Sequence, residues 1–212
     1  GNEQIVVIDG AYHGNTTAVT GISPDRYSGP GGEGPPPTTS EVPRPDRFRG
    51  PYGYNHPDPG SACAADARKV IDDLVATNTA PAAFIAESLM GTSGQIVLPE
   101  GYLRQVFAAV RGAGGLCISD EVQVGFGRLG ETFWGFELGD VVPDIVTMGK
   151  PMGNGHPIAA VVTTREIADA FDRGMKYFNT FGGNPVSCAV ADAVLDEIEQ
   201  QELQARSAEV GA

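Results

Sequence analysis

Short apolar runs of strand length alternate along the chain with stretches in which apolar residues recur every three or four positions. The first pattern is typical of β-strands and the second of amphipathic helices. Because strand and helix follow each other in turn, the pattern predicts an α/β fold with a mostly parallel sheet covered by helices. The expected elements are residues 4–9, 61–77, 82–87, 100–113, 116–120, 144–148, 158–163, 165–173 and 185–204.

The residues within these runs support the same fold class. The expected strands at residues 82–87 and 144–148 are nearly continuous apolar runs, as is typical of strands with both faces buried. In the expected helix at residues 61–77, the apolar residues recur at helical spacing and leave the charged residues for solvent. We therefore expect this helix to cover one face of the sheet.

The pattern is interrupted over residues 21–60. Eighteen of these 40 residues are glycine or proline, including three consecutive prolines at residues 35–37. This composition disfavours any regular element. We expect a long irregular segment that acts as a functional loop, a mobile linker or a subunit contact.

Length and charge limit the classes of protein. The 212 residues suffice for one domain with its own core, and we expect residues 1–212 to form a single domain. The 14 basic and 27 acidic residues give a net charge of −13, which disfavours nucleic acid and anionic membranes as partners because basic side chains dominate such binding. No run of apolar residues reaches the length of a transmembrane helix.

The cysteines and the start of the chain bear on its location. Cys63, Cys117 and Cys188 are odd in number and widely spaced, which predicts buried thiols in a reducing compartment, and we expect a cytoplasmic protein. The first residues lack a signal-peptide pattern. They also lack an initiator methionine and lead directly into a strand-like run, which indicates a piece of a longer polypeptide.

Several familiar patterns do not predict a dinucleotide, metal or serine-nucleophile site in this sequence. Residues 29–34 and 125–130 match G-x-G-x-x-G, but neither has the strand before it and the helix after it that a dinucleotide site requires. His13, His56 and His156 lack the spacing of metal ligands, so we predict no metal site. No serine lies in a G-x-S-x-G motif.

Two charged side chains lie at or close to the carboxyl ends of expected strands. Asp120 ends the strand at residues 116–120, and Lys150 follows the strand at residues 144–148. Ligands of open α/β sheets bind at the carboxyl ends of the strands. A structural ion pair is the alternative, although burying both charges for that purpose is costly. The residues alone leave both interpretations open.

Four longer motifs resemble those of class III aminotransferases, which are fold-type I enzymes dependent on pyridoxal 5'-phosphate (PLP). The resemblance extends from Tyr12-His13-Gly14 to the helix after Pro185 and implies the large, cofactor-binding domain of such an enzyme. The family's N-terminal phosphate loop and C-terminal small domain have no counterpart in residues 1–212. The motifs that carry the resemblance are residues 120–128, 143–150, 153–157 and 179–185.

The resemblance implies a role for each matching residue. Lys150 would form the Schiff base with PLP and carry a proton between substrate and cofactor. Asp120 would keep the pyridine nitrogen protonated, and Gln123 would lie near the phenolic oxygen. Tyr12 would stack on the pyridine ring with His13 beside it. From the residues alone, Gln123 is a solvent-facing amide and Tyr12 merely follows the first strand.

Further implications concern the substrate and a second subunit. Glu87 matches the family's strand-end glutamate beside the substrate, although Ser88 stands where the family usually has proline. Thr180 matches a residue that reaches the PLP phosphate of the neighbouring subunit, which implies a homodimer with shared active sites. From the sequence alone, this segment is a turn into a helix that Asn184 caps and Pro185 begins.

The resemblance implies amino-group transfer between an amine or amino acid and a keto acid or aldehyde. A second reaction stays open, because Pro151 and His156 replace a glycine and a phenylalanine of ordinary transaminases. In these positions the chain is similar to phospho-lyases that eliminate phosphate from ethanolamine phosphate or phosphohydroxylysine. A third alternative is a catalytically inactive binding or assembly fragment, which the proline-rich segment motivates. Transamination leads because the wider family catalyses it.

Overall fold

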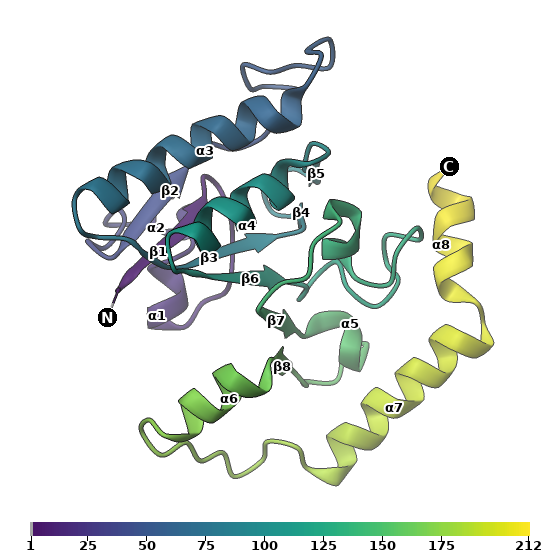
Figure 1. The fold of residues 1–212 in the computed structure, drawn as a ribbon. Helices are drawn as coiled ribbons and strands as arrows, with labels where there is room; N and C mark the ends of the chain where they lie inside the picture. The colour runs from purple at the N-terminus through teal and green to yellow at the C-terminus, as the bar shows by residue number, and fades with distance from the viewer. Residues whose placement is uncertain (1) are drawn as a thin grey trace. The chain divides into compact units, whose positions relative to one another are not determined.

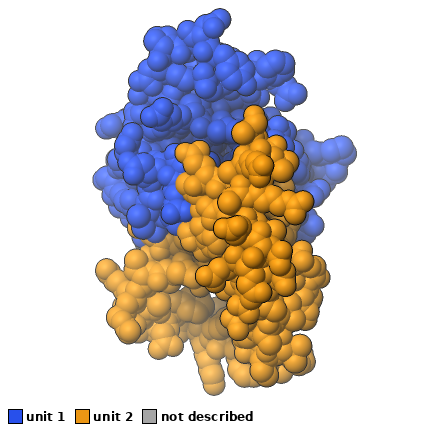
Figure 2. All heavy atoms as spheres, turned by 90° about the vertical axis from the view of Figure 1, so that its right-hand side faces the viewer, with its two compact units in different colours: residues 1–120, 136–143 blue, residues 121–135, 144–212 orange. Residues whose placement is uncertain are grey.

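The structure is a computed structural model that describes residues 2–212. The chain forms two compact units, shown in two colours in Figure 2. Unit 1 comprises residues 1–120 and 136–143, and unit 2 comprises residues 121–135 and 144–212. That residues 1–212 form a single domain stays a prediction.

Unit 1 is built on parallel strands in the order β2-β1-β3-β6. Helices α3 and α4 lie side by side against this sheet (Figure 1). The arrangement confirms the expected parallel sheet with helices on it. The elements of unit 1 are β1 (Gln4–Ile8), α1 (Thr17–Thr20), α2 (Pro24–Tyr27), β2 (Thr39–Val42), α3 (Pro59–Ala76), β3 (Pro81–Glu87), β4 (Leu89–Met90), β5 (Ile96–Val97), α4 (Tyr102–Gly112) and β6 (Leu116–Asp120).

The core of unit 1 lies between the sheet and these two helices. Phe84 of β3 and Phe107 of α4 meet edge to face, with ring centroids 6.1 Å apart, and Ile71 of α3 belongs to the same buried cluster. Gly60, the second residue of α3, lies so close to the chain before α4 that any Cβ there would collide with the carbonyl oxygen of Glu100. Burial of these apolar side chains fixes the sheet whose strand ends carry the predicted site.

Unit 2 contains two antiparallel strands and four helices. Residues 121–135 form turns rather than a helix. An aromatic cluster of Phe126, Phe133 and Trp134 packs this segment, with ring centroids 4.9–5.7 Å apart. The elements are β7 (Ile145–Met148), α5 (Lys150–Gly153), β8 (Ala160–Thr163), α6 (Arg165–Asp172), α7 (Pro185–Gln200) and α8 (Leu203–Gly211), and a short 3-10 helix, η1 (Gly135–Gly139), spans the boundary in sequence between the units.

The prediction of no regular element over residues 21–60 was wrong. This segment contains α2 and the strand β2, and α3 begins before residue 60. β2 pairs in parallel with β1 over four residues. Proline is tolerated at the ends of strands and helices, and here Pro37 and Pro43 lie outside β2 while Pro59 is the first residue of α3. The prolines therefore delimit the elements instead of preventing them.

The single helix predicted over residues 185–204 was also wrong. α7 ends at Gln200, and α8 begins at Leu203. Between them Glu202 adopts a left-handed conformation with φ of +48°. A non-glycine residue in this region is uncommon and ends a helix. No glycine or proline marks the break, so the composition gave no signal for it.

Burial differs from the expectation at two positions. Cys188 is exposed, whereas Cys63 and Cys117 are buried as predicted. Cys188 lies on α7, where few residues are buried within this chain. In β7 only Met148 is fully buried, whereas β3 is buried on both faces as predicted. No helix within residues 2–212 is long and apolar enough to cross a membrane.

Candidate active site

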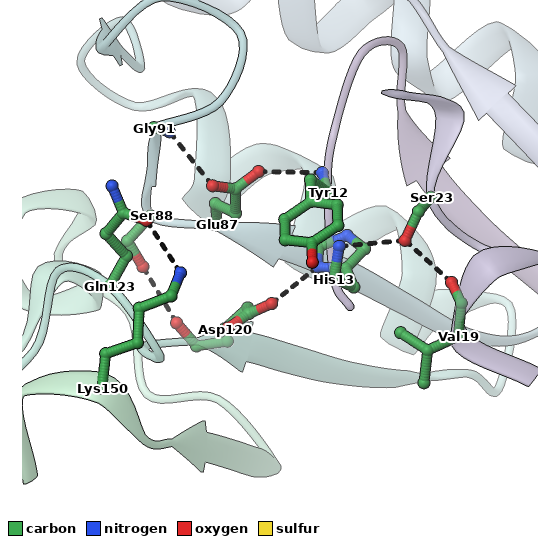
Figure 3. A network of polar contacts seen from close by, with 11 residues as sticks. Tyr12, His13, Val19, Ser23, Glu87, Ser88, Gly91, Asp120, Gln123 and Lys150 are labelled. Atoms are coloured by element: carbon green, nitrogen blue, oxygen red, sulfur yellow. Dashed lines mark hydrogen bonds and ion pairs between the residues drawn. The ribbon is translucent and has the colours of Figure 1, made fainter. Parts of the chain in front are cut away.

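Four of the predicted site residues lie together at the carboxyl ends of the unit 1 strands (Figure 3). Glu87 ends β3 and Asp120 ends β6, and the two are direct partners in the parallel register. Tyr12 and His13 follow β1 four and five residues after its end. Parallel strands bring their carboxyl ends to one edge of a sheet, and this places residues far apart in sequence within hydrogen-bonding distance.

Asp120 is a buried carboxylate paired with a buried histidine. The Asp120 side chain is 7% exposed and that of His13 is 1% exposed, and Oδ2 of Asp120 lies 2.7 Å from Nδ1 of His13. The main-chain N–H of His13 donates to Oγ of Ser23 at 3.0 Å, and this hydroxyl donates to the carbonyl of Val19. Nε2 of His13 is buried without a hydrogen-bond partner among the described residues. His13 is thus oriented through Nδ1 and its main chain.

Tyr12 is half-buried, and its main chain and ring have different partners. Its N–H donates to Oε1 of Glu87 at 3.1 Å. The guanidinium carbon of Arg26 lies 4.7 Å from the centroid of the Tyr12 ring, within the range of a cation–π contact. An aromatic ring held in this way is a suitable surface for stacking a planar ligand.

Glu87 was predicted to lie beside the substrate, and the structure gives both of its oxygens main-chain partners. The side chain is buried, and Oε2 accepts a hydrogen bond of 3.0 Å from the N–H of Gly91. Burial raises the pKa of the Glu87 carboxyl, while the N–H groups of Tyr12 and Gly91 and the nearby His13 oppose the rise.

Lys150 and Gln123 form the second part of the predicted site, in unit 2. β7 ends at Met148, Gly149 precedes α5, and Lys150 is its first residue. Nζ of Lys150 donates to Oε1 of Gln123 at 2.9 Å (Figure 3). The lysine side chain is exposed. A primary amine held by a neutral amide and accessible to a ligand is suited to attack a carbonyl.

Thr180 lies on an exposed segment before α7. The predicted helix start after it is confirmed, since Asn184 is the N-cap and Pro185 the first helical residue. Oδ1 of Asn184 accepts from the N–H of Ser187 at 3.0 Å, and Nδ2 donates to the carbonyl of Phe181 at 2.9 Å. Asn184 thus joins the helix start to the turn that carries Thr180.

Replacing Asn184 with alanine should lower the free energy of unfolding by about 1 kcal/mol, the usual effect of removing an N-cap side chain. Chemical denaturation measures the change. Asn184→Asp keeps the acceptor for the N–H of Ser187 and should lose less. Equal losses in the two variants would show that the cap acceptor contributes little.

Sequence reasoning missed several residues that support the site. Ser23 and Arg26 lie in the segment that was expected to be irregular, and Gly91 lies in the turn between β4 and β5. Their roles depend on contacts with residues far away in sequence, which no local pattern reports. His156, singled out as unusual, lies with Nε2 2.8 Å from Oγ of Ser187 on α7.

Unit 2 also contains a cavity. It has a volume of about 690 Å³ and is lined by residues of α5, α7 and α8 and by Phe126 to Arg128, and none of the seven predicted site residues lines it. Within residues 2–212 no group of three or more histidine, cysteine, aspartate or glutamate side chains is placed to hold a metal ion.

Known proteins resemble this chain over nearly its whole length. The alanine–glyoxylate aminotransferase 2-like protein of Drosophila melanogaster is 48% identical, over 99% of this chain and 43% of that protein. The structure of a phospholyase from Arthrobacter in complex with phosphoethanolamine is 43% identical with a TM-score of 0.86, over 96% of this chain and 47% of that one. An amine transaminase from an uncultivated Pseudomonas species, solved in its PLP-bound form, is 29% identical with a TM-score of 0.85, over 99% and 48%.

These matches identify the family and the part of it that the chain represents. The chain spans less than half the length of the relatives it matches. The family model described as aminotransferase class-III matches residues 1–212. The chain therefore belongs to the class-III aminotransferase family, whose members depend on PLP.

Proposed function

We propose that this chain supplies the cofactor-binding part of an enzyme that transfers an amino group between an amine or amino acid and a keto acid or aldehyde. One observation carries the proposal. Lys150 is exposed directly after β7, and its amine is held by the neutral side chain of Gln123 rather than by a carboxylate. Such an amine is available to bind PLP covalently.

The residues present fit PLP. The buried carboxylate of Asp120 suits a protonated pyridine nitrogen, and the half-buried ring of Tyr12 suits the flat face of the cofactor. His13 adds a buried nitrogen, Nε2, that no described residue satisfies. When bound, PLP supplies an electron sink for the substrate carbon next to nitrogen.

Each residue would then have a distinct task. Lys150 holds the cofactor through Nζ and afterwards carries a proton at the same atom to and from the substrate. Asp120 stabilises the positive pyridine nitrogen, and His13 keeps its carboxylate in place through the contact at Nδ1. Gln123 orients the lysine amine. Tyr12 fixes the plane of the cofactor ring.

We further propose that the enzyme is a homodimer and that Thr180 serves the active site of the neighbouring subunit. Large apolar side chains near Thr180 are almost fully exposed in this chain, including Met175 at 92% and Phe178 at 78%. Exposed apolar side chains that cluster in one segment favour a protein interface. Tyr177 and Phe181 extend the same exposed segment.

A direct assay tests the proposed reaction. The purified holoenzyme is incubated with alanine and glyoxylate, the pair that the name of the Drosophila relative gives. We expect pyruvate and glycine to form together in equal amounts, with many turnovers only when both substrates are present. Formation of pyruvate beyond one equivalent per active site without glyoxylate would contradict transamination.

Phosphate elimination is a second candidate, favoured by the 43% identity with the Arthrobacter phospholyase and by Pro151 and His156. In this reaction a substrate such as ethanolamine phosphate loses inorganic phosphate, and water then releases ammonia and acetaldehyde. The same Lys150 and Asp120 would serve it, because both reactions begin with loss of a proton from the substrate carbon. Release of phosphate from ethanolamine phosphate without any keto acid would establish elimination and reject transamination.

A further inference from the structure

Glu87 has contacts that differ from those of a substrate-binding carboxylate. Its side chain is only 6% exposed. One oxygen accepts from the N–H of Tyr12 at 3.1 Å and the other from the N–H of Gly91 at 3.0 Å (Figure 3). Both partners are main-chain groups of this chain, so the carboxylate joins the segment after β1 to the turn after β4.

The main chain around Tyr12 depends on side chains for its hydrogen bonds. β1 ends at Ile8, so Tyr12 and His13 lie beyond the sheet ladder. The N–H of His13 is held by Ser23, and that of Tyr12 is held by Glu87. A buried N–H without a partner is costly. Glu87 therefore fixes the main chain at Tyr12, whose ring is proposed to stack on the cofactor.

The electrostatic surroundings of Glu87 agree with a fixed rather than a reactive carboxyl. His13 and Asp120 are the charged or titratable groups near it, and burial raises its pKa. The two N–H groups favour its charged form. A buried carboxylate that two main-chain N–H groups orient in this way is held rigidly. It is therefore unsuited to move with a substrate during a reaction.

We propose that Glu87 is a positioning residue that holds Tyr12 in place for stacking on PLP and does not contact the substrate. This inference rests on the proposed function, because it assumes that PLP binds to Lys150 and stacks on Tyr12. The hydrogen-bond partners of Glu87 are then main-chain groups of the protein and not groups of the substrate.

The test uses Glu87→Gln in the purified enzyme, with PLP affinity measured by titrating the PLP-free protein and following absorbance. Glutamine keeps one acceptor but turns an N–H donor toward one of the two main-chain donors. We expect PLP to bind about tenfold more weakly, the scale of one lost hydrogen bond to a charged group. At saturating PLP, the KM for whichever of alanine or ethanolamine phosphate is turned over should change less than about twofold.

Asp46 offers a matched control within unit 1. It is also a buried carboxylate that accepts two main-chain N–H groups, both at Oδ1, from Phe48 at 2.8 Å and from Arg49 at 3.2 Å. Asp46→Ala removes this acceptor and should lower the melting temperature but leave the PLP affinity unchanged. An equal loss of PLP affinity in this variant would overturn the inference, because the effect would then reflect general stability.

A double-mutant cycle with Tyr12→Ala decides whether Glu87 acts through Tyr12. If it does, Glu87→Gln should weaken PLP binding less than about twofold when Tyr12 is already absent. The same tenfold loss without Tyr12 would overturn the inference. So would a raised KM with unchanged PLP affinity, since that result assigns Glu87 to the substrate.

Two further results keep the test decisive. If Glu87→Gln does not fold, Glu87→Asp replaces it, because the shorter carboxylate keeps its charge but cannot span both N–H groups; the same coupling to Tyr12 is expected. If the wild-type protein does not bind PLP at Lys150, the proposed function itself fails. If the wild-type protein binds PLP at Lys150 but the Glu87 variants keep the wild-type PLP affinity, as is expected of the Asp46 control, only the inference about Glu87 fails.

Discussion

Replacing Lys150 with alanine is expected to abolish covalent binding of PLP. The chain contains three lysines, Lys69, Lys150 and Lys176, so the result can be assigned to one residue. Without the amine of Lys150, PLP has no covalent partner at the strand end, and turnover should fall by at least about 10⁴, the scale on which enzymes lose activity with their nucleophile. Borohydride reduction followed by peptide mapping measures the loss.

Lys69→Ala is the matched control for this prediction. Nζ of Lys69 lies 2.8 Å from Oδ1 of Asp66, and this hydrogen bond raises the pKa of the lysine and keeps its amine protonated. A protonated amine does not attack a carbonyl. We therefore expect Lys69→Ala to keep both the PLP label and the activity. A label that stays in the Lys150→Ala protein at Lys69 or Lys176 would reject the assigned role.

Lys150→Arg distinguishes the positive charge of Lys150 from its ability to bind PLP covalently. Arginine keeps a positive charge and the capacity to donate to Gln123, but its guanidinium stays protonated in proteins. The arginine variant should therefore be as inactive as the alanine variant. Recovery of activity with arginine would show that Lys150 serves only as a positive charge.

The positions of the main site residues follow from strand ends that the sequence marks clearly. The run at residues 116–120 begins after Gly114-Gly115 and ends in Asp120, and β6 has these bounds. Lys150 likewise follows the apolar run of β7. A buried strand must end where the chain returns to polar residues, so hydrophobic pattern alone locates these two side chains, although it does not show what they bind.

The supports of the site were not predictable in the same way. Ser23 and Arg26, which contact His13 and Tyr12, belong to a glycine- and proline-rich segment whose composition suggested a loop. The strand β2 in that segment is held by pairing with β1, more than 30 residues earlier. Such pairing energy is absent from local propensity. The main-chain contacts of Glu87 were not predictable for a related reason, because the N–H groups of Tyr12 and Gly91 lie 75 and 4 residues away.

Replacing Asp120 with asparagine is expected to lower kcat by about 10² to 10³, the scale for removing one charged group that stabilises a transition state. Asparagine has nearly the same shape and can still hydrogen-bond to Nδ1 of His13, whichever nitrogen of the ring carries the proton. The variant therefore keeps the geometry and loses the negative charge. In the proposed site that charge would keep the pyridine nitrogen of PLP protonated, and with a neutral partner the ring would accept electrons poorly.

The control for Asp120→Asn is Asp9→Asn in the same unit. Asp9 directly follows β1, and its carboxylate pairs with Arg44 at 3.2 Å. A partly exposed ion pair of this kind contributes little to stability, so this variant should keep wild-type kcat. Rates under saturating PLP and substrate, together with borohydride labelling, distinguish lost chemistry from lost binding. We expect Asp120→Asn to retain the label at Lys150 while turning over slowly. A kcat within about threefold of wild type would mean that the Asp120 charge does not act on the cofactor.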